Sequence, residues 1–88
     1  MKFRKVLGVF PMKPGSGWRF RVMVELSRGR GDPVLPGVPV ADVLCGDGKL
    51  EVGSVGVAGT REYTRPARSP RGVVPAVRAY LDRKGIIL

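Results

Sequence analysis

The fold is decided by residues 18–26, which read Trp18-Arg19-Phe20-Arg21-Val22-Met23-Val24-Glu25-Leu26. Apolar side chains stand at every second position, and all but one of the side chains between them are charged. This period of two predicts a half-buried β-strand, because successive side chains of a strand point to opposite faces. A second strand-like run covers about residues 2–10. Prolines and glycines separate the two runs, so the segment is expected to fold as a hairpin.

One register of this hairpin makes both of its faces consistent. It pairs three apolar residues of each strand on the inner face, with Phe3, Leu7 and Val9 opposite Leu26, Val22 and Phe20. The same register places Arg4 beside Glu25 on the outer face. A slip of one residue would reverse both faces, which makes the register specific. The outer face then carries four basic residues, Lys2, Arg4, Arg19 and Arg21.

Residues 40–58 predict a second hairpin. The strands are residues 40–45 and 49–58, and Gly46-Asp47-Gly48 supplies residues that tolerate a positive φ in a tight turn. In the return strand, the apolar residues occupy even-numbered positions before Gly53 (Leu50 and Val52) and odd-numbered positions after it (Val55 and Val57). Such a shift indicates a β-bulge, and bulges bend strands. Residues 27–39, between the hairpins, are expected to be loop. Arg28 and Arg30 stand there between glycines, as phosphate contacts or as a solvated turn.

The last third of the chain contains a basic segment and a C-terminal element. Residues 60–72 are rich in arginine and broken by proline. Pro75 suits the first position of a helix and Gly85 the residue after its end, so residues 73–88 favour one short helix, with a last strand over residues 77–82 as the alternative. The expected fold is mostly β, a small antiparallel β-barrel or curled sheet with one short C-terminal helix. It forms a single domain over residues 1–88, with a β core at 1–59, a basic segment at 60–72 and the C-terminal element at 73–88.

The composition argues against catalysis. The 88 residues include no His and a single Cys, which removes His-based triads, the usual acid–base group at neutral pH and cysteine-rich metal sites. We therefore expect neither an enzyme nor a bound metal or cofactor. Cys45 is expected to be a half-buried apolar residue, with a reactive thiol as the alternative. The N-terminus has no signal-peptide pattern and no apolar run is long enough for a membrane helix, so a cytoplasmic protein without membrane contact is expected.

Two further absences bear on the source and the ligand. Asn and Gln are missing, which fits a protein from a hot environment, although the arginine-rich composition also fits codon bias in a GC-rich genome. Bidentate reading of adenine uses Asn or Gln. If the protein binds nucleic acid, we therefore expect it to use phosphate contacts, shape and base stacking, and not to read the base sequence in the major groove.

The positive charge is concentrated in two blocks. Residues 1–30 hold eight basic residues and one acidic residue, a net charge of +7, and residues 60–88 hold seven and two, a net charge of +5. The middle segment, 31–59, has a net charge of −3, and the chain totals +9. Two basic blocks of this size are typical of nucleic-acid or ribonucleoprotein components, although they also describe a merely solvated surface. The candidate nucleic-acid-binding residues are Lys2, Arg4, Arg19, Arg21, Arg28, Arg30, Arg61, Tyr63, Arg65, Arg68 and Arg71.

Aromatic and apolar residues add candidate contacts. Tyr63 lies within the basic segment and can stack on a base. Trp18 and Phe20 alternate with arginines, so they point away from them and are expected in the core, with a stacking platform as the alternative. The apolar C-terminal end is expected to dock on the core or on a partner subunit through Ile86, Ile87 and Leu88.

The order of several short motifs resembles one family. These motifs are Leu7-Gly8-Val9-Phe10, Gly15-Ser16-Gly17, Leu35-Pro36-Gly37-Val38-Pro39-Val40-Ala41-Asp42, Val52-Gly53-Ser54-Val55, and Val57-Ala58-Gly59 with Tyr63. Over about residues 7–66 the pattern is similar to that of the GAR-type small β-barrel subunit of H/ACA ribonucleoproteins. Thr60 and Glu62 stand where that pattern has proline. The resemblance implies a closed barrel ending in a strand, and a protein that binds a pseudouridine synthase rather than catalysing a reaction.

Three functions follow from these observations. The first is an RNA or ribonucleoprotein component that binds RNA, a protein subunit or both without reading sequence. The second is a DNA-binding protein, single-stranded or chromatin-type, possible as a homodimer. It requires the basic face of the first hairpin and residues 61–71 to form one continuous surface. The third is a protein-interaction or viral accessory module, which predicts scattered charges and a dominant apolar patch.

Overall fold

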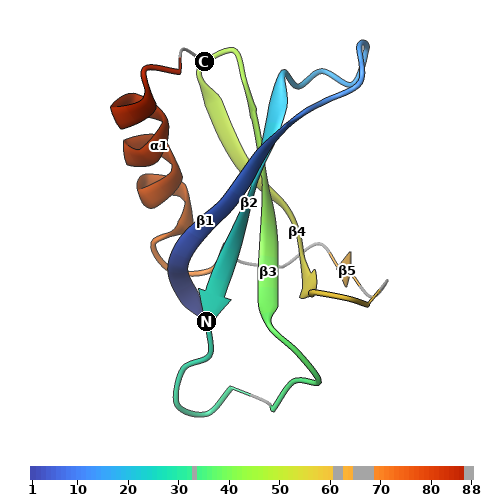
Figure 1. The fold of residues 1–88 in the computed structure, drawn as a ribbon, viewed down its shortest axis with the longest axis vertical. Coiled ribbons are helices and arrows are strands. Elements are labelled where there is room, and N and C mark those ends of the chain that lie inside the picture. Colours follow the sequence, from blue (N-terminus) through green and yellow to red (C-terminus); the bar gives the residue numbers. More distant parts are fainter. Residues whose placement is uncertain (33, 61–62, 65–68, 87–88) are drawn as a thin grey trace.

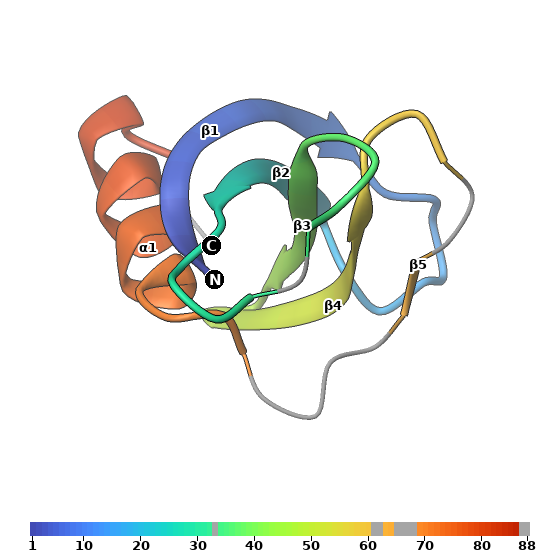
Figure 2. The same cartoon turned by 90° about the horizontal axis from the view of Figure 1, so that it is seen from below.

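The computed structural model describes residues 1–88 except 33, 61–62, 65–68 and 87–88. Five strands form one antiparallel sheet in chain order, and a helix follows: β1 (Lys2–Pro11), β2 (Phe20–Ser27), β3 (Pro39–Gly46), β4 (Lys49–Val57), β5 (Tyr63–Thr64) and α1 (Val73–Lys84). The sheet curls strongly without closing into a barrel (Figures 1 and 2). The expected mostly β architecture with a C-terminal helix is confirmed in its curled-sheet form, and the alternative of a last strand over residues 77–82 is wrong.

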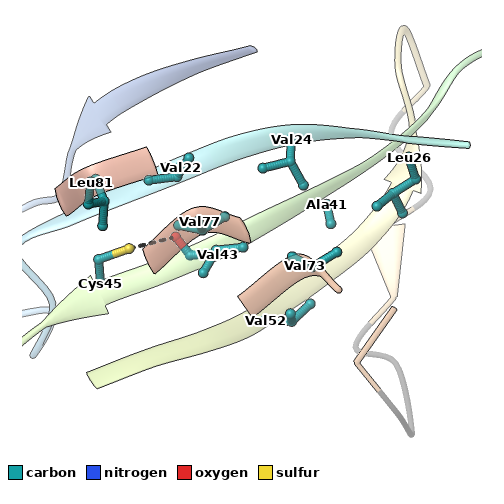
Figure 3. Close-up of a cluster of buried hydrophobic side chains, with 10 residues drawn as sticks. All are labelled: Val22, Val24, Leu26, Ala41, Val43, Cys45, Val52, Val73, Val77 and Leu81. Atoms are coloured by element: carbon teal, nitrogen blue, oxygen red, sulfur yellow. Dashed lines mark hydrogen bonds between the residues drawn. The ribbon is translucent and has the colours of Figure 1, made fainter. Parts of the chain in front are cut away.

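The hydrophobic core lies between the inner face of the sheet and α1. Strict alternation along β2 and β3 turns one set of apolar side chains inward, and α1 adds buried residues at positions 73, 77 and 81, four residues apart, which is one helical face. Figure 3 shows these side chains converging between the strands and the helix. The core consists of Val22, Val24, Leu26, Ala41, Val43, Cys45, Val52, Val73, Val77 and Leu81.

The helix fills the opening that the curled sheet leaves. Within the sheet, α1 contacts β1 and β4, the first and last of the long strands. Figure 2 shows the helix beside the gap between these two strands. Both ends of α1 are set by glycine: Gly72 and Gly85 have φ of 75° and 69°, the left-handed region that favours glycine. Pro75 is the third helical residue rather than the first. Its missing N–H costs nothing there, because the first N–H groups of a helix have no intrahelical partner.

The first hairpin departs from the predicted register. Phe3 pairs with Leu26 as expected, but Val9 pairs with Val22, and the register shifts twice along β1. The shifts leave Arg4 and Leu7 as extra residues, and Leu7 is exposed. The prediction that Leu7 lies opposite Val22 and Val9 opposite Phe20 is therefore wrong. Each bulge inserts one residue, and after two bulges Val9 again lies on the same face of the sheet as the buried Val22, although the last three residues of β1 are exposed.

The second hairpin follows the sequence prediction. Asp47 and Gly48 both have positive φ, 49° and 76°, as the tight two-residue turn requires. Asp42 pairs with Ser54 and Val43 with Val52, so Gly53 is the extra residue of a bulge in β4. The bulge predicted from the phase shift at Gly53 is confirmed.

Candidate nucleic-acid interface

The two basic blocks of the chain meet at the start of β1. The Phe3 N–H donates to the Arg71 carbonyl oxygen at 3.0 Å, and the Arg71 N–H donates to the Met1 carbonyl oxygen at 3.2 Å. These bonds form a parallel bridge between Lys2 and Arg71. Side chains of bridged residues leave the sheet on the same side, so the two cations, both exposed, lie next to each other.

A third cation extends this surface along β1. Lys5 pairs with Glu25 and Lys2 with Ser27, two positions on the same face of β2, so Lys5 shares the outer face with Lys2. Among the described residues, no acidic side chain forms an ion pair with Lys2, Lys5 or Arg71. We call these three residues the basic edge. Their uncompensated charge makes the basic edge suited to a polyanion.

Two of the predicted arginines are instead paired within the protein. Arg4 Nη1 lies 3.1 Å from Glu25 Oε2, a buried oxygen that accepts no hydrogen bond from a described residue, and Arg21 Nη1 donates to Asp42 Oδ1 at 2.9 Å. The Arg21 guanidinium also lies over the Phe10 ring, 4.8 Å from its centroid. The predicted neighbourhood of Arg4 and Glu25 is confirmed. A carboxylate lies beside each arginine and lowers the positive potential around it, more for the half-buried Arg21 than for the exposed Arg4.

Arg28 and Arg30 lie in an ordered turn rather than in an open loop. Asp32 Oδ2 accepts the Gly29 N–H at 2.6 Å and lies 3.0 Å from the amino group of Met1, while the Asp32 N–H donates to the Gly29 carbonyl oxygen. These contacts, the Gly29 N–H first, hold the pKa of Asp32 below its ordinary value. Both arginines are exposed. The turn is tied to the end of the chain at which β1 begins, and it therefore presents its cations near the basic edge.

The remaining predicted residues are dispersed. Arg19 is exposed at the end of the β1–β2 loop, where its N–H donates to the Cys45 carbonyl oxygen. Tyr63 is 41% exposed on β5, at the other side of the sheet from β1. Arg61, Arg65, Arg68, Ile87 and Leu88 lie outside the described residues. At the basic edge, a predicted cation of the second block, Arg71, thus lies next to a predicted cation of the first, Lys2.

The aromatic and C-terminal residues divide between core and surface. Phe20 packs against the core, as predicted, whereas Trp18, also expected in the core, is half-buried in the β1–β2 loop and is not among the described residues packed on the core. Ile86 packs on the core too, and its N–H donates to the Leu81 carbonyl oxygen at 3.0 Å. Ile86 therefore docks on its own chain, which was one of the two expectations for the C-terminal end.

The outer face of the sheet carries a pocket that sequence reasoning missed. Its volume is about 540 Å³. One wall is the β1–β2 loop and the floor is the outer face of β2, β3 and β4; the lining residues are Pro11, Met12, Lys13, Ser16, Arg21, Asp42, Leu44, Gly53 and Ser54. The signal in the sequence was Leu44, an apolar residue that alternation places on the polar face.

Two observations concern potential metal ligands and the single thiol. No group of three or more Cys, Asp or Glu side chains among them is arranged to hold a metal ion. Cys45 is fully buried, its Sγ donates to the Val43 carbonyl oxygen at 3.5 Å, and burial raises the pKa of the thiol to about 11. A protonated, inaccessible thiol is a poor nucleophile. Within the described part of the chain, no helix has the length and apolar character needed to span a bilayer.

Comparisons with known proteins found no similarity that points to a function. No family model matches the chain, and neither a curated protein nor a solved structure is significantly similar to it.

Proposed function

We propose that this protein is a non-catalytic nucleic-acid-binding module that holds single-stranded RNA by its phosphates, as a component of a ribonucleoprotein. The observation that carries the proposal is the bridge between Lys2 and Arg71. A DNA ligand would use the same surface, so the test below compares the two polymers. It joins the two basic blocks, which an acidic segment separates in the sequence, into one exposed surface. The family resemblance contributes less, because it implies a closed barrel ending in a strand, whereas the sheet is open and residues 73–84 are helical.

Charge and geometry support a backbone-binding mode. Lys2, Lys5 and Arg71 follow one sheet edge without acidic partners among the described residues, so a phosphate chain lying along β1 meets several cations in succession. Such contacts release counterions and give affinity without base recognition. The absence of Asn and Gln from the whole sequence fits a protein that does not read bases in the major groove.

The test is a salt-titrated binding assay with labelled single-stranded RNA, single-stranded DNA and duplex DNA. We expect the affinity for RNA to fall steeply between about 50 and 200 mM salt, and to exceed that for either DNA. Replacing Lys2 and Arg71 together by Ala removes two phosphate contacts. The slope of log affinity against log salt concentration should therefore decrease by about 1.4, at roughly 0.7 for each contact with a single strand.

The matched control removes the same charge from the opposite end of the molecule. Lys49 begins β4 and Arg83 lies in the last turn of α1, and Figure 1 shows both elements' ends far from the start of β1. The variant with Lys49→Ala and Arg83→Ala should keep the wild-type slope. Tighter binding to DNA would replace RNA by DNA as the ligand. Absence of binding at about 150 mM salt would overturn the proposal and direct the search to a protein partner.

A further inference from the structure

The outer-face pocket is open because of a glycine. Gly53 is the bulge residue of β4, and a Cβ atom at this position would lie 3.0 Å from Leu44 Cδ1 and 3.1 Å from Leu44 Cγ. Leu44 therefore lies directly against the bare backbone of the bulge. Any larger side chain at position 53 would displace Leu44 or occupy the floor of the pocket. The bulge thus creates an apolar floor on a face that is otherwise largely polar.

The polar groups of the pocket are held in place. Arg21 is fixed from two sides, by its hydrogen bond to Asp42 and by the Phe10 ring beneath its guanidinium. The pair leaves Asp42 Oδ2 as an acceptor and several guanidinium N–H groups as donors. Ser54 supplies a hydroxyl group at another wall, whereas the Ser16 hydroxyl already donates to the Trp18 carbonyl oxygen and accepts the Trp18 N–H. Donors and acceptors therefore surround an apolar floor and need little reorganisation to bind a ligand.

A nucleobase matches this combination of surfaces. Its faces are flat and apolar and its edge carries donors and acceptors, so it can pack between Met12 and Leu44 while its edge meets Arg21 and Asp42. Lys13 lines the same pocket and can meet the attached phosphate. We propose that the outer-face pocket takes one unpaired nucleobase of the bound strand. This inference rests on the proposed function, because the strand along β1 delivers the base.

The experiment compares two RNA strands of equal length and charge, one with bases and one abasic, in the same salt titration. The wild-type protein should bind the base-bearing strand about tenfold more tightly, as expected for one stacked base. The Gly53→Val variant, which fills the floor without changing charge, should bind both strands alike and keep the wild-type salt dependence. Val34→Ser is the matched control: it changes an apolar side chain that is 86% exposed and does not line the pocket, and it should keep the tenfold preference.

The outcomes separate this inference from the proposed function. Equal, salt-dependent binding of both strands by the wild-type protein would overturn the pocket proposal and leave phosphate binding intact. If neither strand binds, the proposed function fails, and nucleoside monophosphates are then titrated while the amide signals of Gly53 and Ser54 are followed by NMR. Shifts that are saturable and absent in Gly53→Val would retain the pocket as a site for a free nucleotide. Unchanged signals would overturn it.

Discussion

At the scale of single residues, Cys45 is the most informative. Its side chain is fully buried, and loss of hydration raises the pKa of its thiol from 9.0 to about 11. Folding therefore favours the protonated thiol. The stability that the protonated Cys45 thiol contributes is complete below about pH 9 and is lost as the pH rises from about 9 to 11. We expect the free energy of unfolding to fall by about 2–3 kcal/mol over this interval, since each tenfold change in ionisation is worth about 1.4 kcal/mol.

Denaturant unfolding at a series of pH values measures this loss. The Cys45→Ala variant is the control, because lysine and tyrosine ionisation affect it equally while the thiol is gone. The difference between the two proteins should change with pH as described, and the native wild-type thiol should resist a soluble disulfide reagent. Parallel pH curves for the two proteins, or rapid modification of native Cys45, would contradict the prediction.

At the scale of elements, α1 is the part without which the sheet cannot bury its inner face. Its buried side chains are those of Val73, Val77 and Leu81, and the sheet alone leaves the gap between β1 and β4 open. Leu81→Ala should lower the free energy of unfolding by about 2–4 kcal/mol, because it removes buried methyl groups and leaves a cavity. Chemical denaturation checks this value.

The control for this prediction stays on the same helix. Arg83 is exposed in the last turn of α1, so Arg83→Ala should change the free energy of unfolding by no more than about 0.5 kcal/mol. Equal effects of the two substitutions would show that α1 does not share the core with the sheet.

At the scale of the whole molecule, net charge opposes the folded state. The chain carries +9, and three ion pairs join described residues. Repulsion among the many cations outweighs these few attractions, and salt screens the repulsion. The melting temperature should therefore rise by several degrees as sodium chloride is added up to about 0.3 M. The Lys2→Ala and Arg71→Ala double variant should melt higher than wild type at low salt and gain less from added salt. A melting temperature that falls with salt would show that attractive pairs dominate.

The local pattern of the sequence predicted several features that depend on neighbouring residues. Alternation over residues 18–26 predicted β2, the glycines at 46 and 48 predicted the turn, and the phase shift at Gly53 predicted a bulge. The helix followed from Pro75 and Gly85, although Pro75 is the third helical residue and not the first. In each case the chemistry that selects the structure lies within a few residues: side-chain direction alternates along a strand, and glycine alone adopts a left-handed φ without strain.

Most of the candidate site could not be predicted in this way. Leu7 was predicted to face the core because the sequence gives no sign that Arg4 and Leu7 are bulge residues. The apolar alternation of a strand of this length is the same whether the strand contains no bulge or two bulges. The neutralisation of Arg21 by Asp42 joins residues 21 positions apart, and only the pairing of β2 with β3 brings them together.

What the sequence determined by itself is the four long strands and the helix, the apolar face of β2 and the presence of two basic blocks. The tertiary structure decided which charges remain free and where they meet. The bridge between Lys2 and Arg71 forms because α1 packs across the gap of the curled sheet and places Arg71, two residues before its first residue, beside the start of β1. The outer-face pocket likewise depends on a loop of one hairpin lying over a bulge of the other. Both are contacts between distant segments, whose energy comes from burying apolar surface that no local pattern assigns to a partner.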